Sequence, residues 1–143
     1  MLTCLFYRWA QFSGELSTVF SRIADRLADP CGYTDSTLLL ADGLELFYYF
    51  VTFAPLSRGS AVCGYAALCA VLRCGGYELA AHLPENRQLD WEAILAQTRS
   101  AFCTTAASLV QVRLCEGGLD ELPSVAQAFP TLRAVVEGLL RAK

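Results

Sequence analysis

Apolar residues recur at steps of three and four along most of this chain, which is the period of an amphipathic α-helix. The first stripe consists of Leu16, Val19, Phe20, Ile23 and Leu27, with charged residues between them. Every strong apolar period in the sequence is helical, and the breaks fall at proline and glycine, which end helices. The sequence therefore predicts an all-α fold with little or no sheet.

The breaks divide the chain into about five main helices. They are expected at about 16–27, 38–52, 60–74, 90–114 and from Pro130 to about Leu139. Thr34 or Asp35 is a suitable N-cap for the second helix, and Ser60 for the third. The third helix is rich in alanine, glycine and cysteine, so we expect it at the centre of the bundle, with Gly64 and Ala67 at close helix contacts. Without repeats or a low-complexity linker, residues 1–143 should form one compact domain.

Composition limits the classes of partner. Apolar residues make up 55% of the chain and charged residues 17%, which indicates either a very complete core or an apolar face that meets a partner. The net charge is −3 and the basic residues are scattered, so nucleic acid is not an expected partner. The most apolar window, 38–56, contains Asp42 and Glu45, so no membrane span is expected. The first residues do not resemble a secretory signal, which favours an intracellular, cytoplasmic protein.

The sequence offers little material for a metal or cofactor site. Its seven cysteines include no pair with the two-residue gap of zinc knuckles, and His82 is the one histidine. We therefore expect no metal and no cofactor, and interpret the cysteines as small apolar residues. Asp42 and Glu45, three positions apart, are interpreted as part of a solvated polar stripe.

The stretch Ser57-Arg58-Gly59-Ser60 precedes the third helix. A helix N-terminus presents free N–H groups, and Arg58 beside it would hold a phosphate or carboxylate, so Arg58, Gly59 and Ser60 are candidate ligand-binding residues. The alternative is that Ser60 caps the helix, Gly59 makes the turn and Arg58 pairs with an acid such as Glu45 or Asp90.

Residues 42–77 resemble the core of Fic-type AMP-transferases. Pro55 and Gly59 stand at the proline and first glycine of that family's loop motif, and Gly76-Tyr77 matches the end of the helix that follows. The resemblance implies a nucleotide-binding scaffold, but Ala54 stands at the position of the catalytic histidine, so the general base is missing. Arg58 stands at the metal-binding acid. A chain of this kind would keep the scaffold without the chemistry.

Two phrases resemble the C-terminal region of large eukaryotic tetratricopeptide-repeat proteins. They are Pro-Leu-Ser-Arg-Gly-Ser-Ala at 55–61 and Asp-Trp-Glu-Ala-Ile-Leu at 90–95. This resemblance implies no enzyme.

Aromatic residues supply the candidate partner contacts, since tryptophan and tyrosine often anchor interfaces. The candidates are Tyr7, Trp9, Phe12 and Tyr49. The leading hypothesis is a non-catalytic helical interaction module, an adaptor or small subunit that binds a protein or a second copy of itself. The alternative is a Fic-like enzyme or a domain that binds a nucleotide or another phosphate-bearing molecule around the 54–60 loop. The first requires a continuous apolar patch, and the second requires a concave basic pocket at Arg58.

Overall fold

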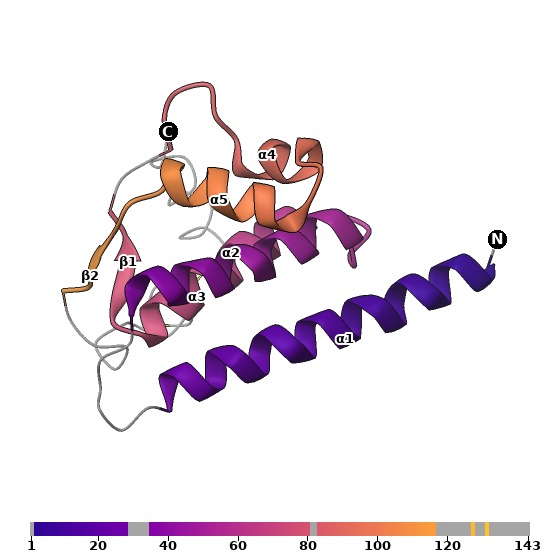
Figure 1. Cartoon of the computed structure of the whole chain (residues 1–143), viewed down its shortest axis with the longest axis horizontal. Coiled ribbons are helices and arrows are strands. Elements are labelled where there is room, and N and C mark those ends of the chain that lie inside the picture. Colours follow the sequence, from indigo (N-terminus) through magenta and orange to yellow (C-terminus); the bar gives the residue numbers. More distant parts are fainter. Residues whose placement is uncertain (1, 29–34, 81–82, 117–126, 128–130, 132–143) are drawn as a thin grey trace.

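The computed structural model describes residues 2–28, 35–80, 83–116, 127 and 131, without the side chains of residues 2–8. Its elements are helices α1 (Leu2–Leu27), α2 (Ser36–Phe53), α3 (Ser60–Cys74), α4 (Leu89–Leu95) and α5 (Arg99–Leu109), and strands β1 (Tyr77–Leu79) and β2 (Val112–Leu114). The two strands pair antiparallel, with Glu78 opposite Arg113. The prediction of a compact, mostly α-helical fold is confirmed (Figure 1). The helix expected from Pro130 lies outside the described residues.

The helix on which the others pack is α2. Figure 1 shows α1 on one side of it and α4 and α5 on the other, and α3 lies against it along its length. Leu39, Leu44 and Leu46 of α2 are fully buried. The expected bounds of the small-residue helix, 60–74, are confirmed, but α3 occupies a flanking place because only one of its faces meets α2. Val62, on another face, is 72% exposed.

Glycines bring α2 and α3 together. A Cβ added at Gly64 would lie 2.7 Å from the Cβ of Phe50, and one added at Gly43 would lie 2.6 Å from Leu68 Cδ1. These separations are shorter than ordinary van der Waals contact. The backbones of α2 and α3 can therefore lie this close only because Gly43 and Gly64 have no side chain. The expectation of a close contact at Gly64 is confirmed, and Ala67 is half-buried against the core.

Gly64→Ala should destabilise the domain by about 1–3 kcal/mol, because the added methyl group displaces the rigid Cβ of Phe50. The matched control is Gly14→Ala in α1, where nothing lies within 4 Å of the added atom. That variant should gain up to about 1 kcal/mol from helix propensity. Urea unfolding of the two variants measures both changes, and a Gly64→Ala protein as stable as the Gly14→Ala protein would contradict the close packing of α2 and α3.

The single helix expected at 90–114 is wrong, since the structure has α4, α5 and β2 in this range. Ala96 and Thr98 are extended, and the Thr98 side chain accepts the N–H of Ala101 at 3.1 Å, which caps a new helix. After α5 the chain extends again and pairs with β1. Phe102 is consequently buried in the core, whereas Trp91 of α4 is 56% exposed.

Asp35 is confirmed as the N-cap of α2, where its carboxylate accepts the N–H of Thr37 at 2.8 Å.

No helix within the described residues combines the length and apolar character of a membrane span.

Candidate functional site

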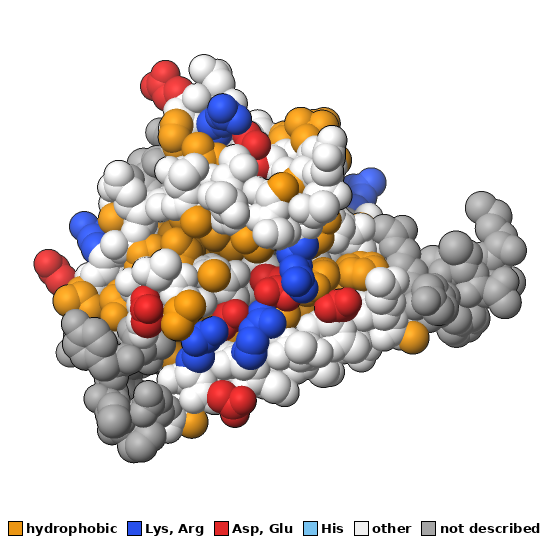
Figure 2. Space-filling view, viewed as in Figure 1, with side chains coloured by type: hydrophobic (Ala, Val, Ile, Leu, Met, Phe, Trp, Pro, Cys, Tyr) orange, Lys and Arg blue, Asp and Glu red, His pale blue; other side chains and the backbone are white. Residues whose placement is uncertain are grey.

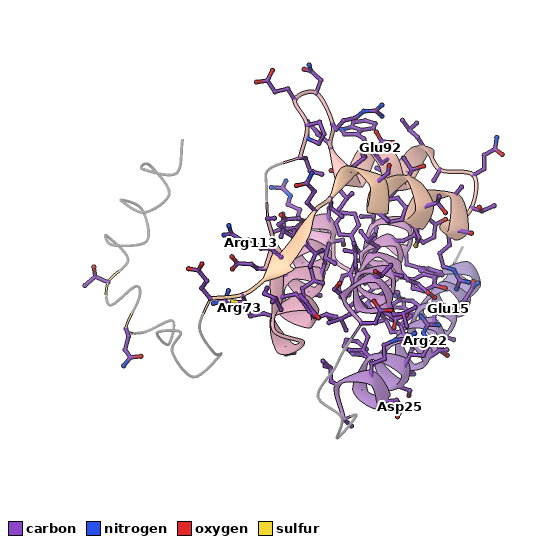
Figure 3. All side chains as sticks on the ribbon, turned by 60° about the vertical axis from the view of Figure 1, so that its left-hand side comes forward. Glu15, Arg22, Asp25, Arg73, Glu92 and Arg113 are labelled. Carbon is purple, nitrogen blue, oxygen red and sulfur yellow. The ribbon has the colours of Figure 1, made fainter. Side chains whose placement is uncertain are left out.

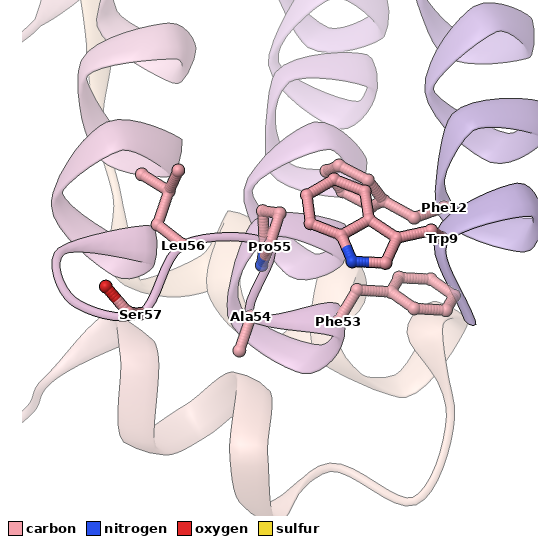
Figure 4. A pocket seen from close by; sticks show the side chains of 7 residues that line it. All are labelled: Trp9, Phe12, Phe53, Ala54, Pro55, Leu56 and Ser57. Carbon is pink, nitrogen blue, oxygen red and sulfur yellow. The ribbon is translucent and has the colours of Figure 1, made fainter. Parts of the chain in front are cut away.

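A surface hollow of about 180 Å³ lies between α1 and the loop that joins α2 to α3 (Figure 4). Its lining consists of Trp9, Phe12, Phe53, Ala54, Pro55, Leu56 and Ser57. Trp9 is 51% exposed and Leu56 is 45% exposed, while Phe12 is buried. None of the described residues that line the hollow carries a charge. The hollow is therefore an apolar depression with two large exposed apolar side chains.

The loop beside the hollow has a defined backbone. Ala54 ends α2 in the left-handed conformation with φ of 46°, and Gly59 precedes α3 with φ of 80°. Between them, the Ser60 hydroxyl accepts the N–H of Leu56 at 3.0 Å and donates to its carbonyl at 3.2 Å. Ser60 thus holds the backbone of Leu56 in position. The sequence predicted that Ser60 would cap α3, and in the structure its hydroxyl does not do so.

Aromatic contacts hold the other wall of the hollow. Phe12 meets Trp9 edge to face at 6.0 Å between ring centroids, and meets Phe50 in the same way at 5.7 Å. Phe53 lies 5.6 Å from Phe12. These are favourable geometries for aromatic pairs. The exposed indole of Trp9 therefore rests on a packed base of aromatic rings contributed by both α1 and α2.

An ion-pair network joins α1 to α2 and α5. Asp42 is only 5% exposed, and its two carboxylate oxygens accept from Arg22 Nε at 3.0 Å and Arg26 Nε at 2.6 Å. Glu45 binds Arg22 and Arg99, each at 2.7 Å. Figure 2 shows basic and acidic side chains gathered along the seam between α1 and the helices above it, and Figure 3 labels Arg22 of this network. The interpretation of Asp42 and Glu45 as a solvated stripe is wrong, because their partners lie on other helices.

Tyr49 belongs to the same network. Its hydroxyl donates to Glu15 Oε2 at 2.8 Å and accepts from Arg99 Nη1 at 2.7 Å, and the residue is 6% exposed. Burial, followed by the hydrogen bond to Glu15, raises the pKa of Tyr49 to about 12. This role could not be predicted from the sequence, since Glu15 and Arg99 lie far from Tyr49 along the chain.

The raised pKa of Tyr49 predicts a loss of stability in alkali. Because the folded protein holds this proton more tightly than the unfolded chain does, its contribution is complete below pH 10 and is lost as the pH rises from about 10 to about 12. Over that range the wild type should lose at most about 3 kcal/mol more than Tyr49→Phe, which has no proton to release. Unfolding by urea at several pH values measures the difference, and parallel curves for the two proteins would contradict the raised pKa.

None of the three candidate ligand-binding residues, Arg58, Gly59 and Ser60, lines the hollow. Arg58 is exposed, lies outside the lining of the hollow, and forms no ion pair with any residue of the described ranges. The suggested acids are engaged elsewhere, because Glu45 binds Arg22 and Arg99 and the Asp90 carboxylate accepts the N–H of Trp91 at 3.0 Å. Gly59 makes the turn into α3, as expected of it in the alternative interpretation.

The four candidate partner residues differ in their surroundings. Trp9 and Phe12 meet at the hollow, one on its rim and one in its base. Tyr49 is buried, and its ring lies 5.8 Å from that of Phe53. The side chain of Tyr7 lies outside the described residues. Sequence reasoning did not single out Leu56, since its exposure depends on the course of the loop.

Cysteines and acids are dispersed over the described part of the chain. No group of three or more histidine, cysteine, aspartate or glutamate side chains there is placed to hold a metal ion. The described cysteines are free thiols, and burial raises the pKa of Cys103 to about 11. This thiol is therefore a poor nucleophile at neutral pH.

Two known proteins are similar to this chain. Suppressor of RPS4-RLD 1 from Arabidopsis thaliana is 29% identical over 141 residues, which cover 95% of this chain and 13% of the plant protein. Human Tetratricopeptide repeat protein 13 is 38% identical over 70 residues, which cover 49% of this chain and 8% of the human protein. The chain thus corresponds to a small part of each relative.

No protein-family profile and no solved structure matches the chain. The human relative supports the resemblance to large tetratricopeptide-repeat proteins, whereas none of the comparisons supports the resemblance to Fic-type enzymes.

Proposed function

We propose that this chain is a single, non-catalytic helical domain that binds an apolar segment of a protein partner at the hollow beside Trp9. The observation that carries the proposal is the exposure of Trp9 and Leu56 over a depression whose described lining has no charge. In this function the domain acts as an adaptor or small subunit of a larger assembly.

The physical basis is the burial of two large apolar side chains. Covering exposed apolar surface contributes about 25 cal/mol per Å², and tryptophan is a frequent centre of binding energy. Phe12 and Phe53 already hold the Trp9 region in place. Binding a partner therefore orders few side chains there and loses little conformational entropy. The similarity to a protein named for tetratricopeptide repeats agrees with a role beside helical repeats, which present extended binding surfaces.

The rival function, binding or transfer of a nucleotide or phosphate, has less support. It requires a concave basic pocket at Arg58, and Arg58 does not line the hollow. The methyl side chain of Ala54 provides no proton acceptor at the position where the Fic-type enzymes have histidine. We therefore expect no transfer of AMP to a protein by this chain.

Leu56→Asp should weaken partner binding at least about tenfold, because it places a charge at the rim of an apolar contact. The matched control is Leu95→Asp on α4, where the leucine is 74% exposed and lies outside the hollow. Each protein is expressed with an affinity tag in its native host, and the co-purified proteins are quantified by mass spectrometry. A partner recovered equally with both variants would place the binding surface elsewhere.

A further inference from the structure

Strand β2 is the outer strand of the two-stranded sheet. Figure 1 shows β1 between β2 and α3, and within the described ranges β2 pairs with β1 alone. At the ends of the ladder, the N–H of Ala80 donates to the carbonyl of Gln111 and the N–H of Cys115 donates to that of Gly76, each at 2.8 Å. The edge of a sheet exposes main-chain hydrogen-bonding groups, which can accept a further strand.

The register shows which main-chain groups of β2 face outward. Hydrogen-bonded and non-hydrogen-bonded pairs alternate along an antiparallel ladder. Because bonds join residue 80 to 111 and residue 76 to 115, the pair of Glu78 and Arg113 midway between them is hydrogen-bonded. Val112 and Leu114 therefore turn their N–H and carbonyl groups away from β1, and these groups form no hydrogen bond with another described residue. The outer edge of β2 thus offers two donors and two acceptors.

The apolar side chains of β2 lie on one face of the sheet. Val112 is half-buried and packs against the core, while Leu114 is 72% exposed. A second hollow of about 480 Å³, which we call the sheet hollow, lies between Val112, Leu40 of α2 and Cys103 of α5. Leu79, which is opposite Val112 on β1, does not line it, so the sheet hollow lies on the outer side of β2. It has room for an apolar side chain of an added strand.

The opposite face of the sheet carries a surplus of positive charge. Glu78 accepts from Arg73 Nη1 and Arg113 Nη2, each at 2.7 Å, and Figure 3 labels both arginines there. One carboxylate neutralises only one of the two guanidinium groups. The side chain of Arg113 is 64% exposed, against 22% for Arg73, so the remaining charge is accessible at β2.

We propose that the outer edge of β2 binds an extended segment of a protein partner as a third, antiparallel strand. The central residue of this segment is acidic and lies opposite Arg113, and its two neighbours are apolar and lie opposite Val112 and Leu114. In this register the apolar residues exchange main-chain hydrogen bonds with β2, and the acidic residue forms a close non-hydrogen-bonded pair with Arg113. The main-chain bonds supply affinity, while the sheet hollow and Arg113 select the sequence.

Charge disfavours a second copy of this chain as the added strand. An antiparallel pair of β2 strands in the same register places Arg113 opposite its own copy, and like charges directly opposite destabilise a pair of strands. A partner with an acidic residue at that position avoids the repulsion. The outer edge of β2 shares no residue with the lining of the hollow beside Trp9. The proposal therefore does not depend on the function assigned to that hollow.

The test titrates synthetic peptides into the full, isotope-labelled chain and follows its amide signals by NMR. The first probe is the capped peptide Ser-Thr-Val-Glu-Val-Thr-Ser, and the second has lysine in place of glutamate. The glutamate peptide should shift the amide signals of Val112 and Leu114 and slow their hydrogen exchange, because the added strand covers them. The lysine peptide should bind about fivefold more weakly, since it places a like charge opposite Arg113.

Matched controls separate strand addition from other contacts. N-methylation of the glutamate, whose N–H faces away from β2 in this register, should leave binding unchanged, whereas N-methylation of the first valine should abolish it. The Arg113→Gln protein should bind the glutamate and lysine peptides equally.

Several results would overturn the proposal. They are the absence of shifts at Val112 and Leu114, equal binding of the two N-methylated peptides, and a preference for glutamate that persists in Arg113→Gln. Shifts of the same two amides when the protein alone is concentrated would identify a second copy as the occupant, and would overturn it as well.

Discussion

Replacing Arg22 and Arg26 together by alanine should lower the free energy of unfolding by about 3 kcal/mol, at the lower end of the range for breaking a buried ion pair. Both carboxylate oxygens of Asp42 are bound by these two side chains, and Asp42 is 5% exposed. The double variant leaves that carboxylate with neither partner in a largely buried place. The lower end applies because the two arginine side chains are themselves 39% and 31% exposed. Urea unfolding measures the change.

A third substitution identifies the cause. Asp42→Asn in the Arg22→Ala/Arg26→Ala background should recover most of the lost stability, because it removes the unpaired charge and keeps the size of the side chain. Arg113→Ala is the control at a more exposed pair, with an arginine side chain 64% exposed, and should cost less than about 1 kcal/mol. A double variant as stable as the wild type would show that the network does not hold α1 to α2.

Phe47→Ala should cost about 3–5 kcal/mol, because it empties the space where α2, α3 and α5 meet. Phe47 is 2% exposed, its ring stacks on Phe102 at 6.0 Å, and its Cδ2 would lie 3.3 Å from a Cβ at Gly64. Phe20→Ala in α1 removes the same side chain from a position that is 49% exposed. Thermal and urea unfolding should therefore separate the two variants clearly. Similar losses for both would contradict the place of Phe47 in the core.

The helices could be predicted from the sequence wherever the signals are local. The small-residue run before Gly75 gave the bounds of α3, Asp35 gave the start of α2, and Pro55 marked the break between them. These signals act over a few residues, since caps, proline and glycine affect the backbone next to them. The break between α4 and α5 was not predicted, because the role of Thr98 as an N-cap is visible only in the structure.

The site depends on contacts between residues far apart in the chain. Asp42 and Glu45 have the same local pattern whether they face water or arginines, and the difference lies in Arg22, Arg26 and Arg99 on other helices. The two strands have three residues each, too few for an alternating pattern to be recognised. Trp9 was a candidate partner residue because of its type alone, and its place at the hollow depends on its contact with Phe12.

The exposure of Leu56 beside the hollow could not be predicted from the sequence. Its exposure follows from the left-handed conformation of Ala54 and the hydrogen bonds to Ser60. The sequence shows neither feature, because Ser60 is an equally good candidate for a helix cap.

Photo-cross-linking from position 9 in the native host tests whether a protein partner binds at the hollow beside Trp9. A photoreactive phenylalanine derivative replaces Trp9 in one protein and Trp91 in another, since both tryptophans are about half exposed but lie on different helices, α1 and α4. We expect a cross-linked protein partner from position 9, none from position 91, and loss of the position 9 product when Leu56→Asp is added. No partner from position 9, or the same product from both positions, would contradict it.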